Sequence, residues 1–95
     1  MEPVFEWDDR KAEENFKNHG VSFLEAKTVF EDFLSVTIDD EIHSLGERRF
    51  IIVGQSRRQR LLVIVHLQEG NSFRIISARE TTRRERRAYE AGETN

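Results

Sequence analysis

The chain contains no cysteine and only one proline, and its longest purely apolar run, LLVIV, is five residues long. The lack of cysteine excludes disulfides, thiolate zinc sites and thiol nucleophiles. A run of this length cannot span a bilayer, and the start MEPVFEWDD has neither the basic nor the apolar segment of a secretion signal. These absences predict a cytoplasmic protein that does not enter a membrane.

The 95 residues, of which 37% are hydrophobic, suffice for one small core. We therefore expect a single domain over residues 1–95. Residues 1–47 contain thirteen acidic and four basic residues, whereas residues 48–95 contain eleven arginines and five glutamates. Every basic residue after Lys27 is an arginine, whose planar guanidinium binds phosphate or carboxylate through two parallel hydrogen bonds. This choice indicates anion recognition in the second half of the chain.

Periodicity and capping residues predict the order β-α-α-β-β-β-β-α. The short polar connections between the last four strands favour antiparallel hairpins, because a parallel crossover needs a dozen or more residues. The expected fold is α+β, with helices packed on one side of a four- or five-stranded antiparallel sheet. The predicted elements are a strand at 4–7, a helix from Asp8 or Asp9 to about Asn18, a helix within 21–32, strands at 34–39, 48–55, 60–67 and 72–79, and a last helix from Thr81 or Thr82 to near Gly92.

The segment from residue 74 to residue 90 contains six arginines. Four of them lie in the predicted last helix: Arg83, Arg84, Arg86 and Arg87. Three interpretations remain open for them: a solvated face with i, i+4 ion pairs, a phosphate-contacting surface, or a surface for an acidic protein partner.

Arg74 and Arg79 belong to the predicted strand 72–79. Simple alternation places Arg79 on the same face as Ile75 and Ser77, and Arg74 on the other face. Arg79 would then emerge at the end of a partly apolar face, as a site residue does. The alternative is an ordinary charge at the end of a strand.

His43 lies in a polar hairpin, followed by Glu47 and Arg49. An imidazole in such a turn has no evident structural task, and histidine is suited to acid–base chemistry near neutral pH. We expect His66, after an apolar run, to be a hydrogen-bonded core residue. The histidines lack the spacing of a metal site, so no metal or other cofactor is expected.

A polar row on the first helix, Lys11, Asn15 and Asn18, is expected to line a groove. Together with the histidine, the glutamate and the arginines, Lys11 belongs to a set that can cleave RNA without a metal. A base removes the 2′-hydroxyl proton, arginines stabilise charge on the phosphorus, and an acid protonates the leaving oxygen.

Three segments, FEWDDRKAEENFKNHGVSFLEAKTVFED, HSLGERRFIIVG and RIISARETTRRERRAYE, closely resemble the BrnT family of bacterial ribonuclease toxins. The resemblance runs from about Val4 to Glu90. It implies a RelE-like fold, RNA cleavage that inhibits translation, a BrnA-type antitoxin as partner, and contact with operator DNA only through that antitoxin.

The family's polar motif residues fall on six positions of this sequence. These are Lys11, His43, Glu47, Arg49, Arg79 and Tyr89. We assign the first five to catalysis, and Arg74, Arg83, Arg87 and Tyr89 to RNA binding. The chain departs from the family pattern at Asn18, Phe33 and Glu69, which puts full RNA affinity in question. The alternative function is a binding module without enzymatic activity, in which the last helix holds an acidic protein or a nucleic acid.

Overall fold

The computed structural model describes residues 2–41, 43 and 46–92. The elements are β1 (Val4–Glu6), α1 (Asp9–His19), α2 (Phe23–Ala26), the 3₁₀ helix η1 (Lys27–Glu31), β2 (Val36–Asp39), β3 (Arg49–Gln55), β4 (Leu61–Glu69), β5 (Ser72–Glu80) and α3 (Arg83–Glu90). This order and the α+β class confirm the prediction from the sequence.

The five strands form one sheet in the order β1-β5-β4-β3-β2. β2, β3, β4 and β5 pair with their neighbours as antiparallel strands, as predicted. β1 pairs with β5 in parallel, so the sheet is mixed and not wholly antiparallel. The hairpin argument did not apply to β1, because β1 and β5 are separated by most of the chain and no short turn joins them.

Local signals set the helix boundaries. The Asp8 side chain accepts hydrogen bonds from the backbone N–H groups of Arg10 and Lys11, and α1 ends at Gly20, whose φ is +69°. At the start of α3, Thr82 and Glu85 form a reciprocal capping box. The predicted second helix is α-helical only over its first turn and continues as η1.

The core lies between the helices and one face of the sheet. Its buried residues are Val21, Phe23, Ala26 and Val29 from the helical segment, and Ile52, Leu62, Ile64, Ile75 and Ala78 from the strands. Asn15 fixes α1 to this core: its Nδ2 donates to the carbonyls of Val21 and Ala78 over 3.0 and 2.8 Å, and its Oδ1 accepts from the Ala78 N–H over 3.0 Å. The predicted role of Asn15 in lining a groove is therefore wrong, because its amide is consumed by backbone groups inside the protein.

A register shift next to Val65 and His66 decides which way the β5 side chains point. His66 pairs with Ile75, but Val65 pairs with Ser77, so β5 holds one extra residue at this point. Beyond the bulge, Ala78 joins the buried face, and Arg79, opposite Val63, returns to the face that carries Arg74 opposite Leu67. The predicted placement of Arg79 beside Ile75 is therefore wrong, because simple alternation does not count a bulged residue.

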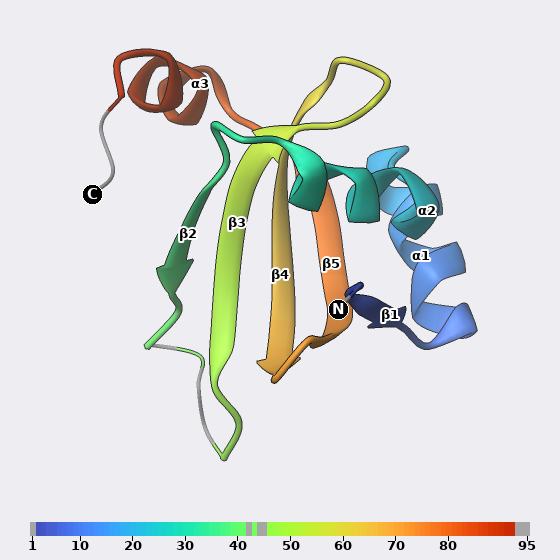
Figure 1. Ribbon diagram of the computed structural model, residues 1–95. Coiled ribbons are helices and arrows are strands. Elements are labelled where there is room, and N and C mark those ends of the chain that lie inside the picture. Colours follow the sequence, from blue (N-terminus) through green and yellow to red (C-terminus); the bar gives the residue numbers. More distant parts are fainter. Residues whose placement is uncertain (1, 42, 44–45, 93–95) are drawn as a thin grey trace.

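The face of the sheet opposite α1, α2 and η1 is called the open face. Pairing and alternation place on it three arginines and a set of mostly aliphatic side chains. They are Arg49, Ile51, Val53, Val63, Val65, Leu67, Arg74, Ser77 and Arg79. The β2–β3 hairpin lies at one end of the sheet, the hairpin end, and α3 lies with the β3–β4 turn at the other, the α3 end (Figure 1).

Candidate functional site

At the hairpin end, His43 is oriented by a carboxylate. Its Nδ1 lies 3.0 Å from Asp40 Oδ1 and 3.1 Å from Asp40 Oδ2, and the Asp40 N–H donates to the Arg49 carbonyl over 2.8 Å. The Asp40 side chain is only 11% exposed, whereas that of His43 is 67% exposed. Because Asp40 accepts the Nδ1 proton, Nε2 is the ring nitrogen left for proton transfer.

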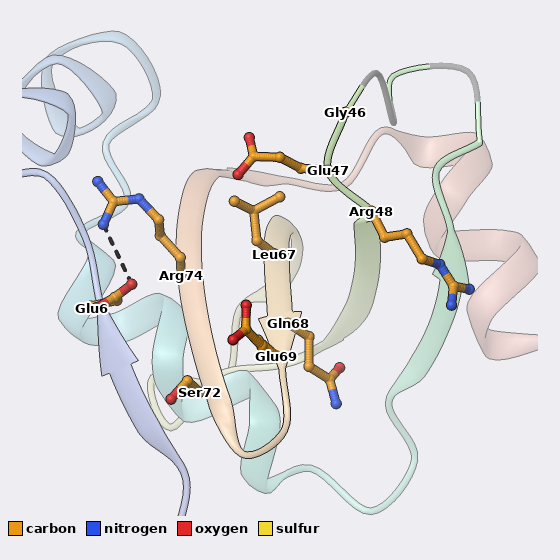
Figure 2. A pocket seen from close by; sticks show the side chains of 9 residues that line it. All are labelled: Glu6, Gly46, Glu47, Arg48, Leu67, Gln68, Glu69, Ser72 and Arg74. Carbon is orange, nitrogen blue, oxygen red and sulfur yellow. Dashed lines mark ion pairs between the residues drawn. The ribbon is translucent and has the colours of Figure 1, made fainter.

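Glu47, the other polar side chain of this hairpin assigned to catalysis, is not bonded to His43. Within the described residues, no hydrogen bond or ion pair joins these two side chains, because Glu47 belongs to the returning arm of the hairpin and lies over Leu67 (Figure 2). Asp40 was missed by the sequence analysis. Its position three residues before His43, within one turn of a hairpin, was the available signal.

A hollow of about 480 Å³ lies beside Glu47 on the open face. Its lining includes Glu6, Leu67, Glu69 and Arg74. Figure 2 shows Arg74 turned toward Glu6, with its Nη1 3.5 Å from the Glu6 carboxylate. Glu69, one of the departures from the family pattern, thus adds a negative charge to this hollow.

Arg49 and Arg74 form a cross-strand row with Leu67 between them. Arg49 pairs with Leu67 on one side, and Arg74 pairs with Leu67 on the other. Their side chains therefore project from the same face, next to the hairpin that carries His43. The structure brings these predicted residues to one end of the open face.

Arg79 lies at the other end of the open face, bound to α3. Its Nη1 and Nη2 donate to Oε1 and Oε2 of Glu85 over 2.8 and 2.9 Å. The same Oε1 accepts the Thr82 N–H over 2.8 Å. The Arg79 guanidinium and the Thr82 N–H together lower the pKa of Glu85 to about 2. Arg79 thus holds the Glu85 carboxylate in a bidentate geometry, which also fits a phosphate.

Arg79 is separated from the Arg49–Arg74 row along β4. Arg79 pairs with Val63, whereas Arg49 and Arg74 pair with Leu67. Val63 and Leu67 are four residues apart on β4, which corresponds to about 13 Å along a strand. With Arg79 turned toward Glu85 and Arg74 toward Glu6, the arginines do not converge on one point.

Tyr89 and the arginines of α3 complete the α3 end. The Tyr89 hydroxyl donates to Asp32 Oδ2 over 2.9 Å, and burial together with this bond raises the pKa of Tyr89 to about 12. None of the described residues pairs with Arg83, Arg84 or Arg87, and the one i, i+4 ion pair described on α3 joins Arg86 to Glu90. Solvated i, i+4 pairing therefore accounts for few of these charges.

Lys11 lies outside this arrangement. It is exposed in the first turn of α1, in the helical layer, and does not line the hollow. Asn18 is exposed on the same helix, and Phe33 is fully exposed before β2.

His66 is buried among aromatic rings. It is 1% exposed, and the ring centroids of Phe30, Phe50 and Phe73 lie 4.9, 5.7 and 5.6 Å away. Neither ring nitrogen has a hydrogen-bond partner among the described residues, so the predicted hydrogen bond is wrong although the burial is confirmed. Burial lowers the pKa of His66 to about 4 and keeps the ring neutral.

The site thus combines a carboxylate-oriented histidine with an arginine-bearing sheet face. In the described part of the chain, no group of three or more His, Asp or Glu side chains could hold a metal ion, and no helix has the length and apolar character needed to cross a membrane. The chain is thus an α+β protein whose open sheet face carries three arginines.

The comparisons with known proteins identify the family. Residues 7–85 match the family model described as the ribonuclease toxin BrnT of type II toxin–antitoxin systems, so the chain belongs to the BrnT family. The crystal structure of the Brucella abortus ribonuclease toxin BrnT has a similar fold, with a TM-score of 0.61 and 21% sequence identity over 87% of this chain and 100% of that chain. No curated protein matches the sequence. Proteins of this type act on RNA and pair with an antitoxin.

Proposed function

We propose that this protein is an endoribonuclease toxin that cleaves RNA without a metal at the hairpin end of the open face. The observation that carries this proposal is the Asp40–His43 pair, bonded through the Asp40 N–H to the Arg49 carbonyl, beside the face that bears Arg49, Arg74 and Arg79. The ribonuclease activity for which the family is named supports it.

In the proposed reaction, the Glu47 carboxylate accepts the proton of the 2′-hydroxyl, and the 2′-oxygen attacks the adjacent phosphorus. The bond from phosphorus to the 5′-oxygen breaks, and His43 Nε2–H donates the proton that this oxygen needs. Asp40 holds the imidazole through Nδ1, and Arg49 stabilises the charge on the phosphate oxygens. The products are a 2′,3′-cyclic phosphate and a 5′-hydroxyl.

Arg79 has a second role in this proposal. Because it lies about 13 Å from the Arg49–Arg74 row along the strand direction, it binds another phosphate of the same RNA strand rather than the one that is cleaved. RNA must displace Glu85 to reach it, and an anion with the bidentate geometry of phosphate is the natural competitor. Arg74, Arg83, Arg87 and Tyr89 extend the contact with RNA, and Lys11 adds positive potential.

In the cell, this cleavage would inhibit translation, and a BrnA-type antitoxin would neutralise the toxin. Contact with operator DNA would occur only through that antitoxin. Growth arrest on induced expression, relieved by co-expression of the antitoxin and abolished by Arg49→Gln, tests this part of the proposal.

Incubation of the purified protein with RNA in the presence of a chelator tests the reaction itself. We expect cleavage with 2′,3′-cyclic phosphate ends at the same rate with and without the chelator. Products with 5′-phosphate ends, or activity lost on chelation, would contradict the mechanism.

A binding module without enzymatic activity is the second candidate. Three α3 arginines without a partner among the described residues, Arg83, Arg84 and Arg87, and the occupied fork of Arg79 favour it, since both fit a surface that only holds an anion. Protein that binds RNA tightly but leaves it intact under all of these conditions would establish this alternative.

A further inference from the structure

The β3–β4 turn, residues 56–60, carries exposed arginines that the proposed chemistry does not use. The side chains of Arg57 and Arg58 are 74% and 73% exposed. Gln59 follows in the left-handed conformation, with φ of +63°. The turn therefore directs two cations into solvent at the α3 end of the molecule (Figure 1).

The backbone of this turn is held in place by a buried residue. Ser56 is 4% exposed, its hydroxyl donates to Glu25 Oε2 over 2.7 Å, and it accepts from the N–H groups of Arg58 and Arg60 over 3.2 and 3.3 Å. The Arg57 N–H donates to Thr28 Oγ1 over 2.9 Å. The positions from which both arginines project are thus fixed before a ligand binds, which lowers the entropic cost of binding.

The charges of these arginines are only weakly compensated. Arg57 pairs with Glu31 over 3.0 Å, but both side chains are more than half exposed, and such surface pairs contribute little. Arg58 lies 3.8 Å from Glu25, whose carboxylate already accepts hydrogen bonds from Ser56 and Arg60. A phosphate can therefore recruit both cations without a large loss of internal contacts.

The turn lies next to α3. A small cleft of about 120 Å³ is lined by Gln59 of the turn and by Arg86 and Tyr89 of α3. Arg60, also in the turn, lies 3.5 Å from Glu80, the residue after Arg79. The turn thus adjoins α3 at this cleft, and Arg60 adjoins the end of β5 that carries Arg79.

We propose that the β3–β4 turn is a second RNA-binding surface, which contacts the phosphodiester backbone of single-stranded RNA several nucleotides from the cleaved bond. This inference rests on the proposed function, because it takes RNA as the ligand of the open face. It predicts that the protein prefers RNA long enough to reach from the hairpin end to the turn.

The test compares Arg57→Gln/Arg58→Gln with Arg10→Gln/Lys17→Gln, which removes two exposed cations from α1. Binding is measured against salt for RNA of about 16 nucleotides and of about 4 nucleotides, the range over which small single-strand-binding domains make contacts. Loss of two phosphate contacts should reduce the salt slope of the long RNA by about 1.4 and weaken its binding on the order of tenfold at physiological salt. Binding and cleavage of the short RNA should stay unchanged, as should both activities of the α1 variant.

Unchanged thermal unfolding of the turn variant establishes that its fold is intact. Equal affinity and salt slope for the turn and α1 variants would overturn the inference, and would do so even if the turn variant bound the antitoxin more weakly. If the parent protein binds both RNAs but cleaves neither, the proposed reaction fails, while the salt slopes still decide whether the turn binds RNA.

Discussion

The hairpin end and the α3 end of the sheet both carry cations, but they hold them differently. At the hairpin end, His43, Arg48 and Arg74 each lie against a carboxylate. At the α3 end, Arg79 and Arg86 pair with Glu85 and Glu90, but Arg83, Arg84 and Arg87 have no carboxylate partner among the described residues. Compensated groups in fixed geometry suit chemistry at one bond, whereas uncompensated charges suit attraction of a polyanion. We therefore expect catalysis at the hairpin end and affinity at the α3 end.

The largest expected effect is on turnover at the hairpin end. His43→Ala should lower kcat by about 10²-fold or more, because it removes the proposed general acid. His19→Ala is the matched control, since His19 is exposed at the end of α1 and should leave kcat unchanged. Single-turnover cleavage of RNA by both purified variants makes the comparison, and parent-like cleavage by His43→Ala would place the catalytic group elsewhere.

The next effect is on how the stability of the protein depends on pH. His66 has a pKa lowered to about 4 in the folded protein from an ordinary value of 6.5, so the unfolded chain binds the proton more tightly. The stability that comes from keeping this ring neutral is complete above pH 6.5 and is lost as the pH falls toward 4. The loss should be on the order of 3 kcal/mol, and urea unfolding of His66→Phe should show no such loss over this range.

The Arg79–Glu85 pair should respond at lower pH. The pKa of Glu85 falls from 4.5 to about 2, so its contribution is complete above pH 4.5 and is lost as the pH falls toward 2. Because the pair is partly exposed, this loss should be on the order of 1 kcal/mol or less. As the pH falls, the loss of stability caused by His66 should begin below pH 6.5, whereas amide exchange of α3 should increase only below pH 4.5. A single window for both would contradict this separation.

A smaller effect is expected on RNA affinity at the α3 end. Arg83→Gln/Arg87→Gln should weaken RNA binding by roughly tenfold at physiological salt, reduce the salt slope by about 1.4 and leave kcat unchanged, because these arginines contact phosphates and not the cleaved bond. Titrations at several salt concentrations measure this. A fall in kcat without a change in the salt slope would reverse the roles assigned to the two ends.

The smallest effect tests whether Glu85 competes with RNA for Arg79. Glu85→Gln should raise RNA affinity a few-fold, because the neutral amide holds the guanidinium less strongly. It should also destabilise the start of α3 by about 1 kcal/mol through the weakened capping box. Glu90→Gln is the control, because Glu90 pairs with Arg86 and not with Arg79. Equal RNA affinity for the two variants would show that Glu85 does not compete with RNA.

Much of the fold was predictable because its signals are local. Asp8 and Gly20 bound α1, Thr82 and Glu85 begin α3, and alternation marks the strands. The cluster of candidate residues at the hairpin end was predictable in part, because His43 and Arg49 are close in sequence. The resemblance to BrnT, shown by the family match, connected them with RNA.

The partners of these residues were not predictable, because they depend on pairing between distant segments. Glu6 meets Arg74 only because β1 adds in parallel to β5, and Asp32 meets Tyr89 only because the end of η1 lies beside α3. Asp40 was within reach in sequence, but its contact with His43 requires the geometry of the hairpin turn.

The sequence by itself determined the helix caps, the strands, the excess of arginine in the second half and the family. Only the tertiary structure decided the side of the sheet on which Arg79 lies, since one bulged residue in β5 turns it to the face that carries Arg74 and Arg49. Alternation along a strand is local, whereas the position of a bulge is fixed by hydrogen bonding to a neighbouring strand and by the burial of Ile75 and Ala78 against the helices.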